Sequence, residues 1–504
     1  MRNSFCRVPV PLSSSRAELR IAVIADSDTR WKWGALTARR LAPDPEHRRV
    51  TGYLLRGRAT PTPRQLGEVG VATDGPPTEV TCAEFLDVLG RERFDVVVLA
   101  LVGGAVQAFL HGVRALWPGP AARPVLVTGY VGVVYEKLAD GLLLRHGADI
   151  VLANSRHDAG RFRAVYEGVG ADPGAVTETA LPFLGGAPYA PVGSRAHTVV
   201  FAVQPSVPES RADRTYLLRR AAGHARLHPD REVLIKLRSR PGEHTTHLEE
   251  HPYQRLADRL PGGLPANCRP VHGNMGEVLD GADLLVTVSS TAALESLHRG
   301  IPTAVLTDLG IREALGNHHF IGSGCLTSWD RLDEGLLPRA DPHWLAAQGV
   351  TAHVPGTAHS PGTAHSSGAA HVPGTAHSPG AAHVPGTAHL PGPAHPSGDA
   401  PAPDGGPDAH AAARDRLAEL LARDRLPAVA PYYTAATAPG YLPGILARHH
   451  LDSDGTPLPG AARQAPTGSG PRRWLRARLR ETARGTYRHG VQRVAPVIRR
   501  LGEL

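Results

Sequence analysis

The fold is decided by the stretch Asp283-Leu-Leu-Val-Thr-Val-Ser-Ser-Thr-Ala-Ala-Leu-Glu-Ser-Leu-His-Arg-Gly-Ile-Pro-Thr-Ala-Val-Leu-Thr-Asp308. Residues 284–288 are apolar and partly β-branched, which predicts a strand buried on both faces. Residues 292–299 predict a short helix, because Gly300 and Pro302 are stop signals just beyond it. Residues 301–306 predict the next strand. A strand, a turn, a helix and a strand in this order form half of a doubly wound parallel sheet.

Three hydroxyl residues, Ser289, Ser290 and Thr291, stand between the first strand and the helix. A helix N-terminus at the carboxyl end of a parallel strand presents free N–H groups and partial positive charge, and both bind anions. Hydroxyl groups at the same place can add hydrogen bonds to phosphate oxygens. The turn therefore predicts a phosphate site, with a simple helix cap by Ser290 as the alternative.

Ser-Ser-Thr-Ala at 289–292, followed by Glu295 and by Gly-Ile-Pro at 300–302, resembles the donor-site turn of glycosyltransferases with the GT-B fold. The similarity is strongest to bacterial enzymes that use CMP-activated acidic sugars. Residues 20–330 also resemble an uncharacterised bacterial family that carries a glycosyltransferase label. The resemblance implies that Ser289, Ser290 and Thr291 hold the nucleotide phosphate and that Glu295 holds the ribose. It also implies two Rossmann-like domains that face each other across a cleft.

The 504 residues leave room for two α/β domains and several extensions. We expect the chain to divide into a flexible N-terminus (1–18), an acceptor domain (19–183), a linker (184–197), a donor domain (198–346), a disordered hexapeptide-repeat segment (347–408), a helical closing segment (409–450), a second linker (451–470) and a basic amphipathic tail (471–504). The repeat carries a histidine every six residues from 353 to 395. Its small residues, prolines and glycines cannot bury a core, so we interpret it as an expanded linker.

The composition argues for a protein of the reducing cytoplasm. The four cysteines form no paired motif, no run of 18 uncharged apolar residues occurs, and the first 20 residues make a poor signal peptide. The whole net charge of +8 is matched by residues 471–504, which hold ten arginines and two glutamates. No nucleic-acid partner is therefore expected for the body of the chain. The tail fits a helix on an anionic membrane surface, at the inner face of the plasma membrane, with RNA or an acidic protein patch as alternatives.

A second candidate donor site follows the predicted strand 232–238. Lys236 and Arg238 are two residues apart, so we expect both on the same face at its carboxyl end, where they would bind a phosphate or carboxylate. We expect this strand and strand 284–288 to be neighbours in the sheet, so that Lys236 and the hydroxyl residues 289–291 form one pocket. Gln204 lies in the loop after the preceding strand, and His247 lies in the loop after Arg238, where it could move protons near neutral pH. A solvated loop with ordinary ion pairs is the alternative. The His-Pro motif that serves the donor phosphate in the CMP-sugar enzymes has no clear counterpart here, which leaves the nucleotide open.

The acceptor side is predicted in the first domain. Strand 19–25 leads into a polar loop at 26–34, whose carboxylates and indoles suit a sugar, while a capped helix with core tryptophans is the alternative. A second group follows strand 124–128. The acceptor candidates are Asp26, Arg30, Trp31, Tyr130 and Tyr135. Asn154 and Ser155 are interpreted as structural, and Asn317 and His319 as weak candidates in a loop over the sugar.

The sequence thus favours glycosyl transfer from a nucleotide-activated sugar, CMP-linked or another, to a cell-surface glycan or glycolipid. Asp28 or Glu136 would accept the proton of the acceptor hydroxyl, and His247 would serve as an acid. No metal ion and no cofactor beyond the nucleotide sugar is expected, because no Asp-x-Asp motif ends a strand of the donor domain. A nucleotide-sugar epimerase or a polyol-phosphate transferase on the same fold is an alternative, and a non-catalytic scaffold at the membrane is another.

Overall fold

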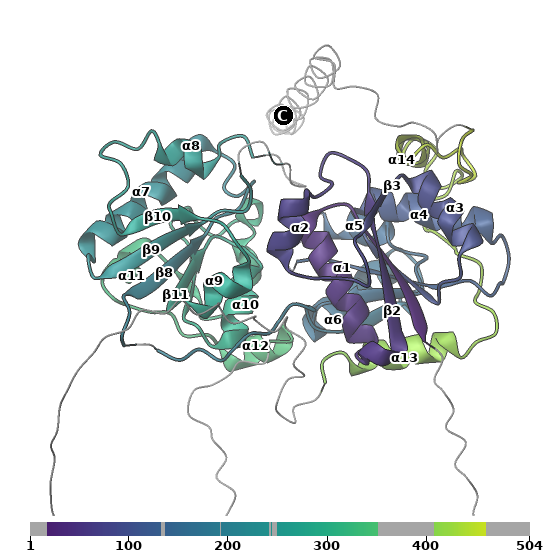
Figure 1. Cartoon of the computed structure of the whole chain (residues 1–504), viewed down its shortest axis with the longest axis horizontal. Helices are drawn as coiled ribbons and strands as arrows, with labels where there is room; N and C mark the ends of the chain where they lie inside the picture. Colours follow the sequence, from purple (N-terminus) through teal and green to yellow (C-terminus); the bar gives the residue numbers. More distant parts are fainter. Residues whose placement is uncertain are drawn as a thin grey trace, which may run out of the picture. The chain divides into compact units, whose positions relative to one another are not determined.

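The computed structural model describes residues 18–132, 137–191, 193–240, 243, 249–350 and 408–459. Both sheets and the helices described below belong to one compact unit that ends at Pro457. The predicted fold class is confirmed, because the chain builds two parallel α/β sheets (Figure 1). The predicted repeat segment and tail lie outside the described residues, except for residues 347–350 and Asp408 of the repeat segment, where Ala347 ends a helix.

The first sheet has seven parallel strands in the order β3-β2-β1-β4-β5-β6-β7. Its central strands are fully buried and rich in Val, Ile and Leu, as strands covered on both faces are. The strands are β1 (Leu19–Ala25), β2 (Arg48–Leu55), β3 (Thr78–Val80), β4 (Val96–Ala100), β5 (Val125–Gly129), β6 (Ile150–Ala153) and β7 (Val176–Glu178).

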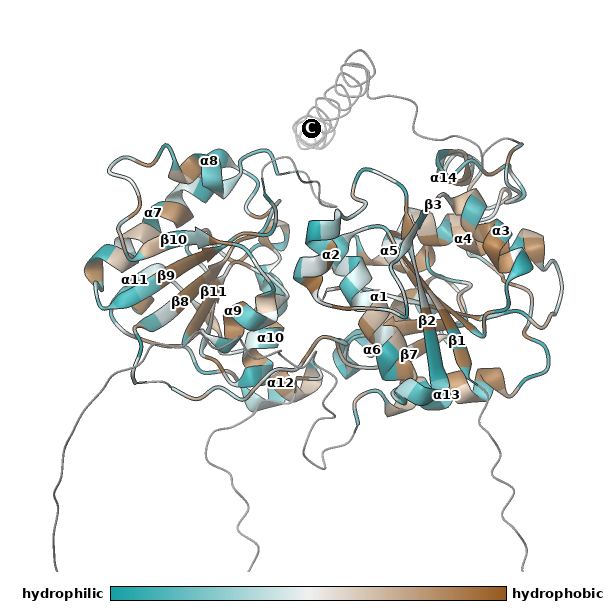
Figure 2. Cartoon of the chain, viewed as in Figure 1, coloured by the Kyte–Doolittle hydropathy of each residue, from teal (hydrophilic) through white to brown (hydrophobic). Residues whose placement is uncertain are grey.

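Helices cover both faces of this sheet and give it two hydrophobic cores. They are α1 (Asp28–Leu41), α2 (Pro63–Val69), α3 (Cys82–Arg91), α4 (Gly103–Leu116), α5 (Leu138–Leu143) and α6 (Arg156–Gly168), with a 3₁₀ turn η1 (Pro45–His47). One core includes the apolar side chains of α3 and α4, and the other includes those of α1. Figure 2 shows the strands mainly in the hydrophobic colour, whereas the helices mix hydrophilic and hydrophobic residues.

The second sheet has six parallel strands in the order β10-β9-β8-β11-β12-β13. The strands are β8 (His197–Ala202), β9 (Arg231–Lys236), β10 (Cys268–Val271), β11 (Leu284–Thr287), β12 (Thr303–Leu306) and β13 (Leu326–Thr327). Its helices are α7 (Arg211–Leu227), α8 (Tyr253–Ala257), α9 (Met275–Asp280), α10 (Ala292–Arg299), α11 (Trp329–Asp333) and α12 (Pro342–Ala347), with 3₁₀ turns η2 (Glu313–Leu315) and η3 (Asn317–Phe320).

The C-terminal helices α13 (Ala411–Leu421) and α14 (Leu442–Arg448) return to the first sheet (Figure 1). Leu417 and Leu420 of α13 join the core beneath α1, while Ile445 and Leu446 of α14 join the core beside α4. The helical closing segment expected at 409–450 therefore contains both α13 and α14. Among the described residues, no helix is both long enough and apolar enough to cross a bilayer.

One expected loop is a helix instead. Residues 28–34 were predicted as part of a polar loop, but α1 already begins at Asp28, and the Ser27 hydroxyl accepts a hydrogen bond from the N–H of Arg30. Serine at the cap followed by aspartate in the first turn is a favoured helix start. The polar residues therefore mark the helix N-terminus, and both Trp31 and Trp33 point into the core.

Candidate functional site

The two predicted donor groups lie at the same edge of the second sheet. In the strand register, Lys236 of β9 pairs with Ala202 of β8, and Ala202 pairs with Thr287 of β11. The carboxyl ends of β9 and β11 are thus level, with β8 between them. Two strand spacings separate them, about 10 Å. The prediction that the two groups lie on neighbouring strands is therefore wrong, because β8 lies between them. The candidate site is one strand wider than expected.

The hydroxyl turn lies between β11 and α10. Thr291 occupies the N-cap of α10 without a side-chain capping bond, while the Ser290 hydroxyl accepts a hydrogen bond of 3.3 Å from the N–H of Ala292. Both side chains are half-buried. Neither the hydroxyl nor the N–H of Thr291 has a hydrogen-bond partner within the described ranges. Thr291 thus offers two free groups at a helix N-terminus, and Ser290 shares its oxygen with the helix.

Ser289 and Gln204 are bonded to each other inside the fold. The Ser289 N–H donates to Oε1 of Gln204 at 2.9 Å, and its hydroxyl donates to the Leu315 carbonyl at 2.6 Å. Nε2 of Gln204 donates in turn to the Ser289 hydroxyl at 3.2 Å. This places the two predicted donor contacts in the framework that holds the turn in place, and it leaves Ser290 and Thr291 as the more accessible hydroxyls.

Lys236 is a buried cation at the end of β9. Its Nζ donates to the Leu237 carbonyl at 2.6 Å, and its side chain is almost inaccessible to solvent. Burial lowers the pKa of Lys236 to about 8; Glu68 opposes this change, while Arg238 and Arg64 add to it. A lysine held in this way is poised to gain a negatively charged ligand, because such a ligand offsets the loss of hydration.

Arg238 lies two residues beyond β9, where its guanidinium contacts α1. It donates to Oδ1 of Asp28 at 2.8 Å and also to the hydroxyl of Thr29. Burial favours the neutral form of Asp28, but the charge and hydrogen bond of Arg238 outweigh burial and hold its pKa below the ordinary value. Asp28 is therefore a weak base as long as Arg238 stays bonded to it, and its predicted role as the base requires this contact to open.

Glu295, the predicted ribose contact, lies in the first turn of α10 and is paired. Its carboxylate oxygen Oε2 is 3.2 Å from Nζ of Lys32 on α1. The Lys32 ammonium also lies 4.9 Å from the centre of the Phe183 ring. A ribose hydroxyl would have to share Glu295 with Lys32. Lys32 was not among the predicted site residues, although lysine occurs only three times in the chain.

The acceptor candidates around α1 are engaged in the fold. Asp26 accepts hydrogen bonds from the N–H of Val102 at 2.9 Å and from Arg30 at 3.0 Å. Trp31 is 1% exposed, and its indole N–H donates to the Val71 carbonyl at 3.3 Å. No indole face is left for a sugar ring. The expectation that Trp31 packs on a sugar is therefore corrected, and the alternative of core tryptophans describes it better.

Tyr130 is also held inside the first domain. Its hydroxyl donates to the Leu138 carbonyl at 3.4 Å, and the Arg145 guanidinium lies 4.2 Å from its ring centre. Asn154 donates to the carbonyls of Tyr130 at 2.8 Å and Gly132 at 3.1 Å, which agrees with its structural interpretation. The predicted site residues Tyr135, Glu136 and His247 lie outside the described residues.

The two candidates in the loop after β12 also have internal roles. Asn317 is fully buried and donates to the carbonyls of Leu306 at 3.0 Å and Gly310 at 2.8 Å, so it shapes the loop. Burial lowers the pKa of His319 to about 4, and positive charge from Arg161 adds to this effect. His319 is therefore neutral near pH 7.

Two charged residues near Lys236 were not foreseen. Arg64 of α2 pairs with Glu68 at 2.8 Å and with Glu243, and Glu68 also accepts a hydrogen bond of 2.5 Å from the N–H of Gly273. Only the pair at positions i and i+4 could have been read from the sequence. The influence of Arg64 and Glu68 on Lys236 requires a fold that brings residues about 170 positions apart together.

A protein-family model described as "Putative glycosyltransferase (DUF6716)" matches residues 21–360. A comparison with curated proteins finds no match. Among solved structures, a "putative UDP-N-acetylglucosamine 2-epimerase" from Listeria monocytogenes is 14% identical, with a TM-score of 0.44 and coverage of 63% of this chain and 87% of that one.

Two further structures give a similar result. An Anabaena protein solved with UDP and glucose is 13% identical, with a TM-score of 0.41 over 63% of this chain and 89% of its own. A UDP-glucosyltransferase from Polygonum tinctorium is 12% identical, with a TM-score of 0.41 over 62% of this chain and 86% of its own. Both structures are covered over most of their own length at low sequence identity.

Proposed function

The chain belongs to the family described as "Putative glycosyltransferase (DUF6716)", and from this premise we propose that it transfers a sugar from a nucleotide-activated donor to a glycan or glycolipid acceptor. One observation carries the proposal: the free N-terminus of α10 and the buried Lys236 end at the same level of one sheet. Ligands of open α/β sheets bind at this edge. A phosphate ester of the donor supplies the negative charge that both groups lack.

The turn at residues 289–291 and Lys236 would bind oxygens of the donor phosphate from two sides. The free N–H and hydroxyl of Thr291, with the Ser290 hydroxyl, would bind phosphate oxygens at the N-terminus of α10. Lys236 would bind from the side of β9, and the added negative charge would keep its ammonium protonated above its ligand-free pKa of about 8. As the sugar leaves, charge develops on the phosphate, and these fixed donors stabilise it.

The base of the reaction is proposed to be Asp28 or Glu136. The charge of Arg238 holds the pKa of Asp28 down. If Arg238 turned toward the donor phosphate, Asp28 would lose its positively charged partner, keep its hydrogen bonds from Thr29 and become a stronger base. Donor binding would thus precede proton transfer from the acceptor hydroxyl. His247 is the proposed acid, and the scheme uses no metal ion and no cofactor other than the nucleotide sugar.

The remaining parts of the proposal rest on the sequence. CMP-linked acidic sugars are one donor class, and other nucleotide sugars are the second. The acceptor would be a cell-surface glycan or a lipid-linked glycan, built at the inner face of the plasma membrane. The arginine-rich tail 471–504 would bring the enzyme to anionic lipids.

Isothermal titration with CMP, UDP and GDP tests the proposal. We expect one nucleotide to bind and the double variant Lys236→Met/Ser290→Ala to bind it at least 100-fold more weakly. A hydrogen bond to a charged group contributes about 1.5–3 kcal/mol, and about 1.4 kcal/mol is tenfold in affinity. Ser328→Ala is the matched control, since Ser328 caps α11 at the end of β13 in the same sheet and should leave affinity unchanged.

Three results would overturn the proposal. Binding of none of the nucleotides would favour the scaffold. Unchanged affinity in the double variant would exclude this edge of the sheet as the phosphate site. Inversion of the sugar of a bound nucleotide sugar in the absence of any acceptor, followed by mass spectrometry and NMR, would favour an epimerase.

A further inference from the structure

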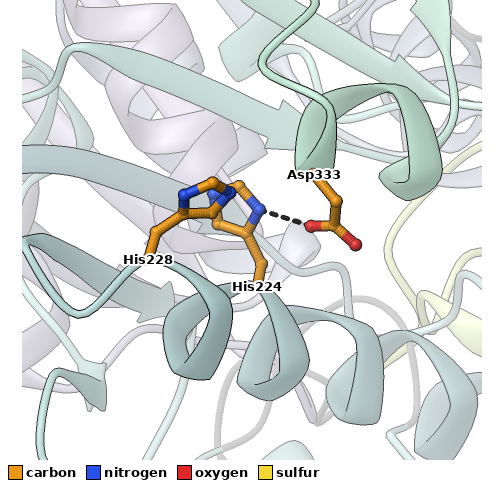
Figure 3. Close-up of side chains that lie close together, drawn as sticks. All are labelled: His224, His228 and Asp333. Carbon is orange, nitrogen blue, oxygen red and sulfur yellow. Dashed lines mark hydrogen bonds and ion pairs between the residues drawn. The ribbon is translucent and has the colours of Figure 1, made fainter.

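A second cluster of polar side chains lies away from the proposed donor site. His224 on α7 and His228 at its C-cap are four residues apart, so their side chains share one face of the helix end. Asp333, the last residue of α11, completes the cluster (Figure 3). Figure 3 shows the three side chains directed toward one another. The cluster is thus built from the ends of two neighbouring helices.

The three side chains are close enough to share one ion. Each offers a ligand atom, and these atoms all lie within 4.8 Å of one another. Nδ1 of His224 is 2.6 Å from Oδ1 of Asp333, and the two imidazole centres are 4.6 Å apart. His224 is fully buried, and the buried Nε2 of His228 has no hydrogen-bond partner in the part of the chain described. A buried nitrogen without a partner requires an explanation.

We propose that His224, His228 and Asp333 bind one Zn²⁺ ion that joins the end of α7 to the end of α11. Two imidazoles and one carboxylate are a zinc ligand set, with Zn–N distances of about 2.0–2.1 Å and Zn–O distances of about 2.0–2.2 Å. His228 and Asp333 are half-exposed, which gives the ion and a fourth ligand, water, a way in. The short contact between His224 and Asp333 would open slightly to admit the ion.

The surroundings partly resemble an outer ligand shell. Arg220 donates to Oδ2 of Asp333 at 3.0 Å, which orients the carboxylate and leaves Oδ1 for the ion. Arg231 lies against the other nitrogen, with Nη1 3.2 Å from Nε2 of His224. That hydrogen bond competes with zinc, because an imidazole bound to zinc through Nδ1 carries its proton on Nε2. Arg231 is half-exposed and must turn away when the ion binds.

The position of the cluster assigns a structural role to the ion. Arg231, beside the cluster, begins β9, whereas Lys236 of the proposed phosphate site ends it. The length of this strand, about 16 Å, separates the two positions. The zinc site would therefore stabilise the second sheet and its helices without taking part in phosphate binding. It does not rest on the proposed transferase function, and each can fail without the other.

The test is thermal unfolding of the full chain, first treated with EDTA and then measured with and without a small excess of ZnCl₂. We expect zinc to raise the Tm of the parent by several degrees, because an ion that binds only the folded state stabilises it. His228→Ala should lose this gain. His47→Ala is the matched control: it removes an exposed histidine that also lies 2.6 Å from an aspartate, Asp44, and it should keep the full gain.

Zinc binding by the other histidines is removed by comparing the zinc-induced gain in Tm between the parent and each variant. The chain has 27 histidines, eight of them in the repeat, and all variants retain the repeat unchanged. Asp333→Asn also loses its ion pair with Arg220, so its gain on zinc addition is compared and not its absolute Tm. An equal gain in the parent and in both cluster variants, or no gain in the parent, would overturn the proposal. Cobalt absorption bands present in the parent and in His47→Ala but absent from His228→Ala would support it independently.

Discussion

At the scale of single residues, the central feature is a lysine that the fold keeps out of water. Lys236 has only a backbone carbonyl as its hydrogen-bond acceptor in the described structure, and burial lowers its pKa to about 8. Each pKa unit corresponds to about 1.4 kcal/mol, so the charged side chain costs the folded protein up to roughly 3 kcal/mol. Such a cost is understandable where a ligand later supplies the missing charge.

Replacing Lys236 should therefore increase the stability of the protein and at the same time weaken nucleotide binding. We expect Lys236→Met to raise the free energy of unfolding at pH 7 by about 1–3 kcal/mol while nucleotide affinity falls at least tenfold. Lys32→Met is the matched comparison, because it removes the partner of the buried Glu295 and should destabilise. Urea unfolding and titration calorimetry measure the two effects. Destabilisation by both variants to the same extent would contradict this account.

The pH dependence follows from the same lysine, with a definite sign. In the unfolded state the Lys236 ammonium keeps its proton up to about pH 10.5, whereas in the folded state it releases the proton near pH 8. Between these values the unfolded state binds more protons, so this residue makes stability increase with pH. We expect the parent to gain stability relative to Lys236→Met between pH 8 and pH 10, as measured by urea unfolding at each pH. A constant difference would show that Lys236 does not titrate in this range.

Some of the site can be predicted from single residues, and some cannot. Lys236 stands out because lysine is rare and because it ends an apolar strand. The pairing of Lys32 with Glu295 joins residues 263 positions apart, and no local pattern reports such a contact. Trp31 was misassigned for a related reason, since an indole beside carboxylates looks the same in sequence whether it faces a sugar or the core. Whether Ser290, Thr291 and Lys236 bind the donor stays a prediction.

At the scale of elements, the stretch 283–308 was well predicted because its signals are strong and agree. The predicted helix at 292–299 has the bounds of α10, and Gly300 ends it in the left-handed conformation with φ of 79°. By contrast, α1 was predicted to begin seven residues too late. Its first turn is polar, and a polar first turn can be mistaken for the preceding loop.

Two glycines test this account of the helices in opposite directions. Gly300→Ala should destabilise by about 1 kcal/mol or more, because a side chain disfavours a positive φ. Gly223→Ala, inside α7, should stabilise by about 0.5–1 kcal/mol, because the added methyl group meets no described atom within 4 Å beyond the adjacent backbone of its own helix, and alanine favours a helix. The difference between their Tm values, measured by calorimetry, is the readout. A stabilising Gly300→Ala would argue against the C-cap geometry.

At the scale of the whole molecule, the two-sheet architecture was predictable, since strands and helices alternate along residues 19–347. The order of the strands was not. Lys236 and Thr287 were expected at adjacent strands, but β8 lies between them, because the crossover from β10 carries the chain past β9 and β8 to β11. Apolar periodicity predicts which segments are strands, but it does not predict which strands pair with each other in the sheet.

Because α13 packs on the first sheet, a substitution in α13 should affect strands that are far from it in the sequence. Leu417 is 3% exposed and joins the same core as α1 and β5. Leu417→Ala should cost about 2–5 kcal/mol. Hydrogen exchange should increase in β5 and β6, which α13 contacts, more than in β8 and β11 of the second sheet. Glu419→Ala, on the exposed side of α13, is the control and should change stability by less than about 0.5 kcal/mol. Equal protection loss in both sheets would contradict this assignment.

The position of α13 and α14 also means that the second sheet is inserted into the first domain in the order of the chain. A protease cut or a gene break between residues 350 and 408 would leave two polypeptides that each carry part of both cores of the first sheet. The shorter piece would present Leu417, Leu420, Ile445 and Leu446 to the pocket they occupy in the intact protein. When the two fragments are co-expressed, they should associate and fold into a non-covalent complex, as the halves of a split protein do.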